Sequence, residues 1–547
     1  MRALRCTSRG SCVMSNEQIV NEVKRRRTFA IISHPDAGKT TLTEKLLLFA
    51  GAIQIAGSVK ARKASRHATS DWMEIEKQRG ISVASSVMQI EYRDCVINLL
   101  DTPGHQDFSE DTYRVLTAVD SALMVIDAAN GVESQTLRLI EVCRARGTPI
   151  MTFINKMDRE GREALQLLDE IEQVLGMPCA PLTWPVGQGK RFGGIFDLRE
   201  QRMRVFQAGE DRRRDADEMI SDPRILQERF GETFAEAHAE IDLVQNASDP
   251  FAHARFLQAR QTPVFFGSAI NNFGVQEVLD ALVDLAPIPA ARKSLTRAVD
   301  PAESQFSGVV FKIQANMDPA HRDRIAFVRV CSGVFERGMK LRVRRTEREL
   351  RPTGVVTFLS QRRDLVEQAY AGDIIGIITH GGLQLGDTVT EGEALQYTGL
   401  PFFAPEMFRT VEIADPMRSK QLQKGLKELG EEGAIQVFRP IAGNLMLLGA
   451  VGQLQFEVAA HRLQSEYGVA VRLAASGYTG ARWVTCEEEA ELQRFVHAQA
   501  GRIALDAAQT HTYLLTTRYD LQFLQERWPR IRFHPLREHA GLVLEAA

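Results

Sequence analysis

The sequence predicts a multidomain protein: a doubly wound α/β domain that carries an inserted subdomain, then an all-β barrel, then an α+β domain. Its 547 residues exceed the roughly 100 to 200 residues of one typical domain. Apolar, β-branched runs alternate with helical stretches through the first half of the chain, which is the pattern of a mostly parallel sheet covered by helices. Short strands punctuated by glycine follow a linker that contains two prolines, and helices return after about residue 405.

Five apolar runs predict the buried strands of the α/β domain. They are TFAIIS (28–33), CVINLLD (95–101), SALMVIDA (121–128), PIMTFINK (149–156) and TPVFFGSA (262–269). Between the third and fourth runs, VESQTLRLIEVCRARG predicts a helix with Leu137 and Ile140 three residues apart and Gly147 as its stop. The alternation of polar and apolar residues in SVMQIEYR (86–93) predicts an antiparallel edge strand.

Changes in composition give the expected domain boundaries. About a hundred residues separate the fourth and fifth apolar runs, too many for a loop, so an inserted subdomain is expected over about 160–260. The prolines of LAPIPAARKS (285–294) mark the linker. We expect the first 13 residues, which precede Met14, to come from an upstream start. The expected units are an N-terminal extension disordered in part (1–22), the α/β domain (23–290), the barrel (300–400) and the α+β domain (401–547).

Composition excludes several classes of protein. Lys plus Arg number 67 against 70 Asp plus Glu, so the net charge of −3 argues against a protein that coats nucleic acid by bulk electrostatics. No apolar run approaches the roughly 20 residues of a membrane helix. The 7 cysteines form no CxxC pair, which fits a reducing compartment and no structural zinc. We therefore expect a soluble, cytoplasmic, monomeric protein with no DNA or membrane partner.

SHPDAGKTT (33–41) lies between a predicted strand and a predicted helix, the setting in which backbone N–H groups and a helix N-terminus bind phosphate. Lys39 is expected to reach the β- and γ-phosphates, the Thr40 hydroxyl to ligate Mg²⁺, and Gly38 to let the backbone approach. Ser33 replaces the first glycine of GxxxxGK[ST], where a small side chain can still fit. The expected nucleotide contacts of this loop are Ser33, His34, Pro35, Asp36, Ala37, Gly38, Lys39, Thr40 and Thr41.

DTPGH (101–105) follows the second apolar run. Asp101 is expected to hold Mg²⁺ through water, the Gly104 N–H to meet the γ-phosphate, and His105 to position the attacking water. Lys39, Gly104 and His105 are thus the expected catalytic residues. Taken alone, the motif is equally consistent with an ordinary turn of Asp, Pro and Gly. Its place after a phosphate loop favours the catalytic interpretation.

NKMD (155–158) and GSA (267–269) predict where a guanine base is read. The Asp158 carboxylate matches the two adjacent donors of guanine, N1–H and the 2-amino group, and would repel adenine. Asn155 is expected to tie loops together and the Lys156 stem to lie over the ring. Ser268 and Ala269 complete the set, with the Ala269 N–H donating to guanine O6. Each motif follows a predicted strand, where doubly wound sheets bind ligands.

The polar, basic segment KARKASRHATSDWMEIEKQRGIS (60–82) ends in a hydroxyl residue. Ser82 is expected to complete the Mg²⁺ shell while the γ-phosphate is present and to withdraw when it leaves. Ser85 and Ser86 are alternatives for that role. A solvated loop is the alternative for the whole segment.

These stretches closely resemble the translational GTPases: HPDAGKTT, QRGIS, DTPGHQDF, NKMD and GSA match the motifs of that family in order and spacing. The resemblance covers nearly the whole chain and implies a P-loop GTPase domain, a β-barrel and an α+β domain. Within the family, the length, the QANMDPAHRDRIAFVRVCSGVFERGMKL stretch and the serine of QRGIS are similar to the bacterial peptide chain release factor 3 group. Elongation factor G has two further domains, for which too little sequence remains.

The resemblance implies a GTPase that binds GTP, GDP and Mg²⁺, joins the ribosome after peptide release and removes the class I release factor. GTP hydrolysis then frees the GTPase itself. It also implies that the ribosome is the activator, since His105 stands where other GTPases keep a glutamine. The alternatives are another translational GTPase, either elongation factor G-like or a ribosome-protection factor, and a GTP-gated ribosome-binding module with incidental hydrolysis.

Two basic runs are candidates for contact with RNA. For KRRR (24–27) a solvated surface is favoured over an RNA contact. RVRRTERELR (342–351), expected on a barrel hairpin, is the better candidate for contact with the ribosome.

Overall fold

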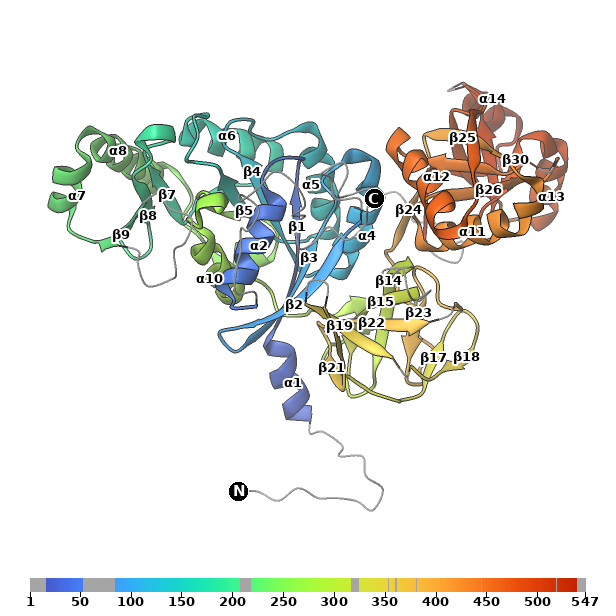
Figure 1. Cartoon of the computed structure of the whole chain (residues 1–547), viewed down its shortest axis with the longest axis horizontal. Coiled ribbons are helices and arrows are strands. Elements are labelled where there is room, and N and C mark those ends of the chain that lie inside the picture. The colour runs from blue at the N-terminus through green and yellow to red at the C-terminus, as the bar shows by residue number, and fades with distance from the viewer. Residues whose placement is uncertain are drawn as a thin grey trace, which may run out of the picture.

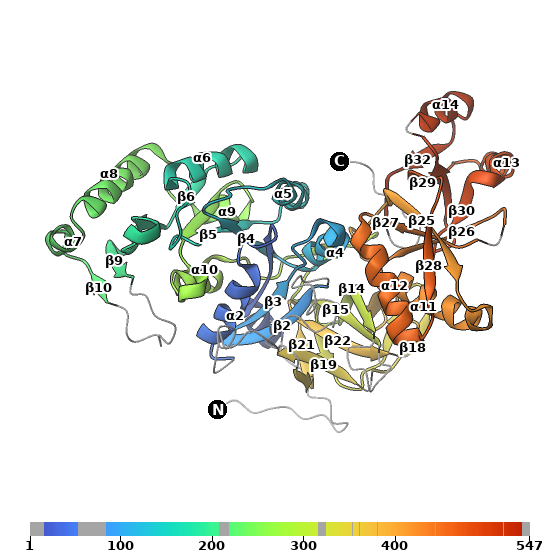
Figure 2. The ribbon, with the colours of Figure 1, turned by 45° about the horizontal axis from the view of Figure 1, so that its top comes forward.

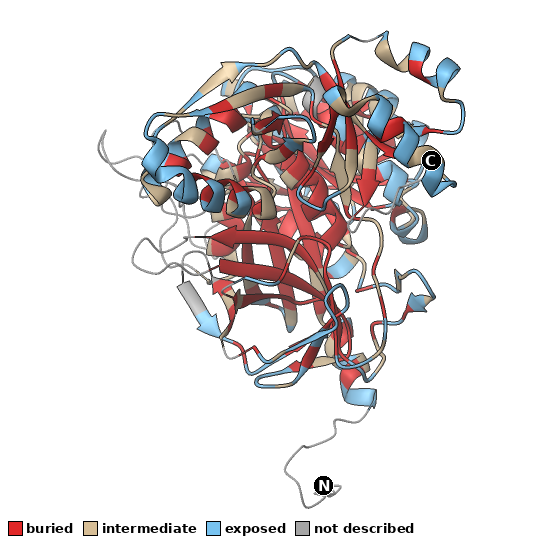
Figure 3. Cartoon of the chain, turned by 90° about the vertical axis from the view of Figure 1, so that its right-hand side faces the viewer, coloured by how far each residue is buried: buried red, intermediate tan, exposed pale blue. Residues whose placement is uncertain are grey.

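The computed structural model describes residues 16–52, 84–206, 218–315, 324–352, 354–359, 362–379, 381–443, 445–517 and 519–538. Figure 1 shows the α/β domain in the middle of the molecule, the inserted elements β7–β9, α7 and α8 at one end, and the C-terminal domain at the other. The barrel lies against the α/β domain beside the C-terminal domain (Figure 1). Buried residues concentrate in the strands, and exposed residues lie on the outer helices (Figure 3).

A seven-stranded sheet forms the centre of the α/β domain, in the order β2-β3-β1-β4-β5-β11-β6. All neighbouring strands are parallel except β2, which is antiparallel to β3 at the edge. The five predicted parallel strands and the predicted edge strand are confirmed. The strands are β1 (Arg26–Ser33), β2 (Ser86–Tyr92), β3 (Cys95–Asp101), β4 (Ser121–Asp127), β5 (Ile150–Asn155), β6 (Cys179–Pro181) and β11 (Thr262–Phe266). The helices are α2 (Lys39–Phe49), α4 (Ser109–Ala118), α5 (Ser134–Arg146), α6 (Ala164–Leu175) and α10 (Val275–Leu285).

Helix α5 confirms the expected stop but corrects the expected buried face. Gly147 caps the helix in the left-handed region at φ 64°. Leu139 and Ile140 are buried, whereas Leu137 is 38% exposed. Leu137 and Ile140 are three residues apart, but Leu139 occupies the position that faces the sheet.

The inserted subdomain is narrower than the expected range of 160–260. Helix α6 packs in the main core, and β6 pairs in parallel with β11, so both belong to the central sheet. A separate four-stranded antiparallel sheet begins only with β7. The elements of the insertion are β7 (Thr183–Val186), β8 (Gly194–Asp197), β9 (Arg202–Val205), β10 (Met219–Ile220), α7 (Pro223–Phe230) and α8 (Glu232–Ala247); α9 (His253–Leu257) leads back to β11.

The barrel consists of short antiparallel strands, as the glycine-punctuated sequence predicts. Eight of them form one sheet in the order β18-β17-β23-β14-β15-β22-β19-β20. RVRRTERELR lies on the β17–β18 hairpin, as expected. The elements after the linker are β12 (Arg292–Lys293), β13 (Ala298–Val299), β14 (Ser307–Ala315), β15 (Arg324–Ser332), β16 (Val334–Glu336), β17 (Leu341–Val343), β18 (Arg348–Leu350), β19 (Val355–Leu359), β20 (Arg362–Leu365), β21 (Gln368–Tyr370), β22 (Ile374–Thr379) and β23 (Thr388–Thr390).

The C-terminal domain is the expected α+β unit, built on one eight-stranded sheet in the order β28-β25-β27-β26-β30-β31-β29-β32. Its two halves have separate cores, one around Leu426 and Leu463 and one around Phe495 and Tyr513. The strands are β24 (Pro401–Phe403), β25 (Met407–Ile413), β26 (Gln436–Pro440), β27 (Leu447–Ala450), β28 (Val471–Ala475), β29 (Gly480–Thr485), β30 (Ile503–Leu505), β31 (His511–Leu515), β32 (Arg532–His534) and β33 (Leu536–Glu538). The helices are α11 (Ser419–Glu432), α12 (Gln453–Tyr467), α13 (Glu489–Ala498) and α14 (Asp520–Arg527).

The extension expected over residues 1–22 is partly ordered. Helix α1 (Asn16–Lys24) buries Ile19 and Val23 against Ala371 of the barrel. These two side chains are four residues apart, so they lie on one face of the helix. Residues 1–15 lie outside the described part of the chain.

The α/β domain and the barrel share buried ion pairs. The Arg26 Nε lies 3.3 Å from both carboxylate oxygens of Asp373 in the barrel. In return, the buried barrel residue Arg329 lies 2.5 Å from Asp120. The KRRR run is therefore not a solvated surface at Arg26, and that side chain is not accessible to RNA: its charge is used between domains.

Helix α4 lies where the three domains meet, beside β14 of the barrel and α12 of the C-terminal domain (Figure 2). Lys312 of β14 reaches across to within 3.6 Å of the Asp111 carboxylate. Burial alone would raise the pKa of Asp111, but the Lys312 charge and hydrogen bonds from Ser85 outweigh it, and the pKa lies below its ordinary value. Arg114 of α4 also donates to the Gly433 carbonyl of the C-terminal domain at 3.4 Å.

Candidate nucleotide-binding site

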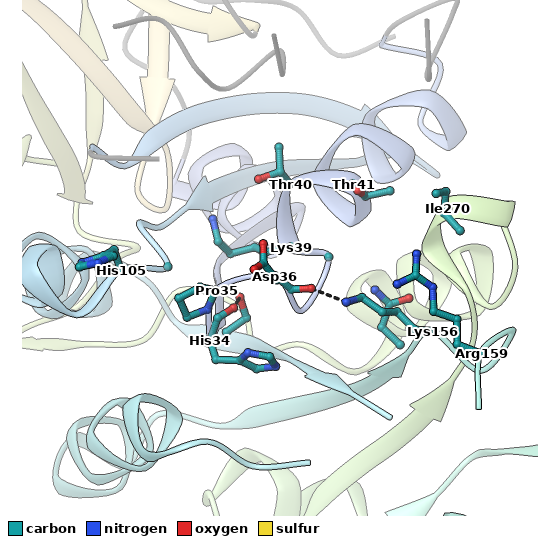
Figure 4. Close-up of a pocket in the computed structure, with 14 residues that line it drawn as sticks. His34, Pro35, Asp36, Lys39, Thr40, Thr41, His105, Lys156, Arg159 and Ile270 are labelled. Carbon is teal, nitrogen blue, oxygen red and sulfur yellow. Dashed lines mark hydrogen bonds between the residues drawn. The ribbon is translucent and has the colours of Figure 1, made fainter. Parts of the chain in front are cut away.

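A cavity of about 460 Å³ opens where β1 and β5 end and α2 begins. Parallel sheets bind ligands at this edge, because loops from several strands meet there. Figure 4 shows His105 at one end of the cavity and Arg159 with Ile270 at the other. The lining residues are Ser33, His34, Pro35, Asp36, Gly38, Lys39, Thr40, Thr41, Gly104, His105, Asn155, Lys156, Arg159 and Ile270.

The loop after β1 has the form that a phosphate site requires. Gly38 caps the N-terminus of α2 at φ 93°, a left-handed conformation that glycine adopts readily. A Cβ at Gly38 would also overlap the Asn155 amide nitrogen. The Ser33 hydroxyl is buried and donates to the His34 carbonyl at 2.9 Å, so it supports the loop.

His34 is placed differently from its neighbours in the loop. Its ring is fully buried, with Nδ1 3.0 Å from a Glu133 carboxylate oxygen. Figure 4 shows the ring directed away from Lys39 and Thr40. Only the backbone of His34 is therefore placed to contact a nucleotide.

The expected base end of the cavity is held together by side chains of the two base-reading motifs. The Asn155 amide donates to the Ala37 carbonyl at 2.8 Å, and its oxygen accepts the Ala269 N–H at 2.9 Å. Asn155 thus ties the phosphate loop to the GSA loop, as expected. The Ser268 hydroxyl donates to the Asp158 carboxylate at 2.6 Å and fixes its direction.

Two expected base contacts have other partners in this structure. The Ala269 N–H, expected to meet guanine O6, donates to Asn155 instead. Lys156 adopts φ 69°, and its ammonium donates to the Asp36 carbonyl at 2.5 Å (Figure 4) and to Asp127 at 2.7 Å. This arrangement anchors the end of the Lys156 side chain beside the cavity.

Asp127, at the end of β4, is the carboxylate that anchors Lys156. Burial alone would raise its pKa, but hydrogen bonds from Lys156 and from the Ala129 N–H outweigh that effect. The pKa of Asp127 therefore lies below its ordinary value, and the ion pair with Lys156 persists at neutral pH.

At the expected phosphate end of the cavity, Lys39 and Asp101 are both present but contact each other. The Lys39 ammonium lies 2.5 Å from Asp101 Oδ1, and both side chains are buried. Asp101 Oδ2 is also buried and has no hydrogen-bond partner among the described residues. A carboxylate oxygen in that position fits a divalent cation, for which Mg²⁺ sites use one or two carboxylates with substrate phosphates. In this structure the Lys39 ammonium is thus paired with Asp101.

His105 lies apart from Lys39 and Thr40 (Figure 4). Its Nδ1 accepts the Asp107 N–H at 3.2 Å, which places the proton of a neutral ring on Nε2. The side chain is 37% exposed. Gly104 backs onto the phosphate loop, where a Cβ would lie 3.5 Å from the Pro35 Cα. The motif thus adjoins the phosphate loop, and its histidine lines the cavity at a place apart from Lys39 and Thr40.

Ser82 and the segment 60–82 lie outside the described residues. Of the two alternatives, Ser85 is engaged elsewhere: its hydroxyl donates to Asp111 at 2.6 Å and accepts from Lys312 at 2.8 Å. Ser86 pairs in register with Asp101, and its buried hydroxyl has no hydrogen-bond partner in the described parts of the chain.

Three residues of the site were missed by reasoning from the sequence. Arg159 and Ile270 line the cavity, and Asp127 anchors Lys156. A signal was available for each: Arg159 directly follows NKMD, Ile270 directly follows GSA, and Asp127 ends an apolar strand run.

Among the described residues, no cluster of three or more His, Cys, Asp or Glu side chains could hold a metal ion by itself. A search of the same residues finds no helix long and apolar enough to cross a membrane.

The chain matches three family models in succession. Residues 24–288 match "Elongation factor Tu GTP binding domain", and residues 305–392 match "Elongation factor G domain 2". Residues 397–525 match "Class II release factor RF3, C-terminal domain". These ranges correspond to the α/β domain, the barrel and most of the C-terminal domain.

Close relatives cover almost the entire chain. Peptide chain release factor 3 of Bordetella avium (strain 197N) is 69% identical over 96% of this chain and 99% of its own length. The protein of the same name from Nitrosomonas europaea is 69% identical over 97% of this chain and 99% of its own length. A crystal structure of a protein from Thermus thermophilus shares the fold, with a TM-score of 0.68 at 24% identity, over 85% of this chain and 69% of that one.

Proposed function

The chain belongs to the peptide chain release factor 3 family of translational GTPases, and on that premise we propose that it dissociates class I release factors from the ribosome after peptide release. GTP hydrolysis, stimulated by the ribosome, then frees the protein itself. The observation that carries this proposal is the C-terminal match to a release-factor domain behind an elongation-factor-type GTP domain. The match of residues 397–525, behind the barrel, favours this function over an elongation factor G-like role.

In this proposal the loop 33–41 and the N-terminus of α2 bind the phosphates. Backbone N–H groups of the loop point at the anion, and Lys39 exchanges Asp101 for the β- and γ-phosphates. Thr40 and Asp101 hold Mg²⁺, which neutralises phosphate charge when bound. The buried oxygen of Asp101 that has no partner among the described residues supports this role.

Asp158 reads the base. Its carboxylate is already aimed by Ser268, and the two donors of guanine match it, whereas adenine offers a lone pair there. Ile270, 38% exposed at the same end, gives the purine an apolar neighbour. Asn155 and Lys156 hold the surrounding loops, and Ala269 can share its N–H with guanine O6.

His105 positions the attacking water once the site is ordered. Because the ring lies apart from Lys39 and Thr40 in this structure, hydrolysis by the isolated protein should be slow. An activator that reorients such a residue can accelerate hydrolysis by about 10³ to 10⁵. We propose the ribosome for that role, a monomer as the working state, the cytoplasm as the compartment and Ser82 as the residue that completes the Mg²⁺ shell.

The direct test follows a fluorescently labelled class I release factor bound to ribosomes whose peptide has been released. Adding this protein with GTP should accelerate loss of the label, and the His105→Ala variant should still do so but remain on the ribosome. No acceleration by the native protein, together with ribosome-stimulated phosphate release, would move it to another branch of the translational GTPases. Label loss without any ribosome-stimulated phosphate release would instead indicate a GTP-gated binding module.

A further inference from the structure

Asp107 connects the catalytic motif to the C-terminal domain. It lies in a short 3₁₀ turn, η2 (Gln106–Phe108), directly after His105. Its carboxylate crosses the domain boundary and accepts the Leu454 N–H at 2.6 Å, in the first turn of α12. An anionic acceptor at a helix N-terminus satisfies a free N–H and interacts favourably with the helix dipole.

The N-terminus of α12 is shaped to receive a carboxylate from outside. Its capping residue is Gly452, which has no side chain to cap the helix. A Cβ at Gly452 would overlap the Asp107 carboxylate. The φ and ψ of Gly452, −143° and 167°, are extended values that any residue adopts, so the glycine is needed for this approach and not for its backbone conformation.

The same residue fixes the histidine. The backbone N–H of Asp107 donates to His105 Nδ1, and the Asp107 carboxylate also lies 3.5 Å from that nitrogen, so Asp107 contacts both α12 and the His105 ring. Phe108, next in the chain, is buried. Moving His105 toward the phosphates therefore requires the η2 turn to move, and α12 is attached to that turn.

We propose that Asp107 is a positioning residue that keeps His105 out of the hydrolytic position for as long as it caps α12. The C-terminal domain then acts as a brake on hydrolysis, which is released when the cap opens. This inference rests on the proposed function, because it assigns His105 to the hydrolysis of GTP. It adds that the basal rate of hydrolysis is set by a contact between the α/β domain and the C-terminal domain.

The strength of a helix cap sets the size of the expected effect. Removing an N-cap costs about 0.5 to 2 kcal/mol, which corresponds to about 2- to 30-fold in a two-state population. Opening the contact should therefore raise ribosome-independent GTP hydrolysis by about 2- to 30-fold. The KM for GTP should be unchanged, because neither partner lines the cavity.

The experiment measures single-turnover GTP hydrolysis by the full chain without ribosomes. Gly452→Ala should raise the rate, because the new methyl group displaces Asp107. The matched control is Gly477→Ala in the same domain, where a Cβ meets nothing within 4 Å, and it should leave the rate unchanged. Asp107→Ala should also raise the rate. In the double variant Gly452→Ala should add nothing, because alanine lacks the carboxylate that the methyl group strikes.

Unchanged or lower rates in both single variants, with native melting temperature and GDP affinity, would overturn the proposal. Asp107→Asn guards against misfolding: it keeps the shape and one acceptor oxygen, and should give a smaller rise than Asp107→Ala. Failure of the proposed function would show itself separately, as native protein whose hydrolysis the ribosome does not stimulate.

Discussion

The two ends of the nucleotide cavity are in different states of readiness. At the base end Asn155 already joins the two loops, and Ser268 already aims Asp158. At the phosphate end Lys39 is paired with Asp101, and His105 lies apart from both Lys39 and Thr40. The base end is thus held by contacts among its own loops, whereas in the proposed function the side chains of the phosphate end change partners before hydrolysis.

The difference follows from what holds each end. The base end is built from loops at the ends of β5 and β11, neighbouring strands of one sheet. The residues next to the phosphate end are attached to other domains: Lys312 of the barrel binds Ser85, which precedes the residue paired with Asp101, and α12 of the C-terminal domain binds Asp107. Recognition of the base is therefore local, and the catalytic arrangement depends on how three domains are placed.

The largest expected effect is at the phosphate end. His105→Ala should reduce ribosome-stimulated GTP hydrolysis by about 10³- to 10⁵-fold, the range that such activation contributes in related switches. GDP affinity should not change, because the ring lies away from Lys39 and Thr40. Phosphate release with saturating ribosomes and GDP titration provide the two measurements. A stimulated rate equal to that of the native protein would show that His105 is only a turn residue.

A change at the base end should affect binding and leave the chemistry of the phosphate end intact. Asp158→Asn should weaken the binding of guanine nucleotides by about 100-fold or more. Two donors of the base lose a charged acceptor, and each unpaired polar group costs about 1–3 kcal/mol. Xanthine nucleotides should bind more tightly to this variant, because the new side-chain amide can donate to the extra carbonyl of xanthine. Competition binding between GDP and XDP measures this preference. If the preference for guanine persisted, Asp158 would not be part of the base site.

Gly38 and Asn155 meet between the two ends of the cavity, and disturbing their contact should give the smallest of the three effects. Gly38→Ala should weaken the binding of GDP by about 10-fold or more. The new methyl group would overlap the Asn155 amide and would also strain the left-handed backbone. Gly51→Ala is the matched control: it has φ 77°, but a Cβ there meets nothing within 4 Å. Calorimetric binding should separate the two, and equal affinities would show that contact between Gly38 and Asn155 is unimportant.

Much of the fold follows from local sequence. The strands that end at Ser33, Asp101 and Asn155 are short, buried apolar runs. Apolar runs of that length are typical of buried strands. Burial between domains was harder to foresee. Arg26 is charged and lies in a basic run, yet it is buried because Asp373, 347 residues away, meets it. Helix α1 was missed because its two apolar side chains are buried against the barrel, far along the chain.

The candidate site shows the same division between features that local sequence predicts and contacts that depend on distant residues. Motif spacing located Lys39, His105 and Asp158, because each follows a strand of one sheet. It could not give their partners. The pairing of Lys39 with Asp101 and the reach of Asp107 to α12 join residues far apart in the sequence, so no local pattern encodes them. The turn of His105 is held by a local hydrogen bond from the Asp107 N–H. Ser82 remains a prediction.

Amide hydrogen exchange at two backbone positions tests most directly whether the two ends differ in readiness. The Ala269 N–H, bonded to Asn155, should be protected in the nucleotide-free protein and in the GDP form alike. The Leu454 N–H, bonded to Asp107, should be protected with GDP and lose protection when ribosomes and a non-hydrolysable GTP analogue are added. An Ala269 amide that exchanges freely until nucleotide binds, or a Leu454 amide equally protected in both states, would contradict this account.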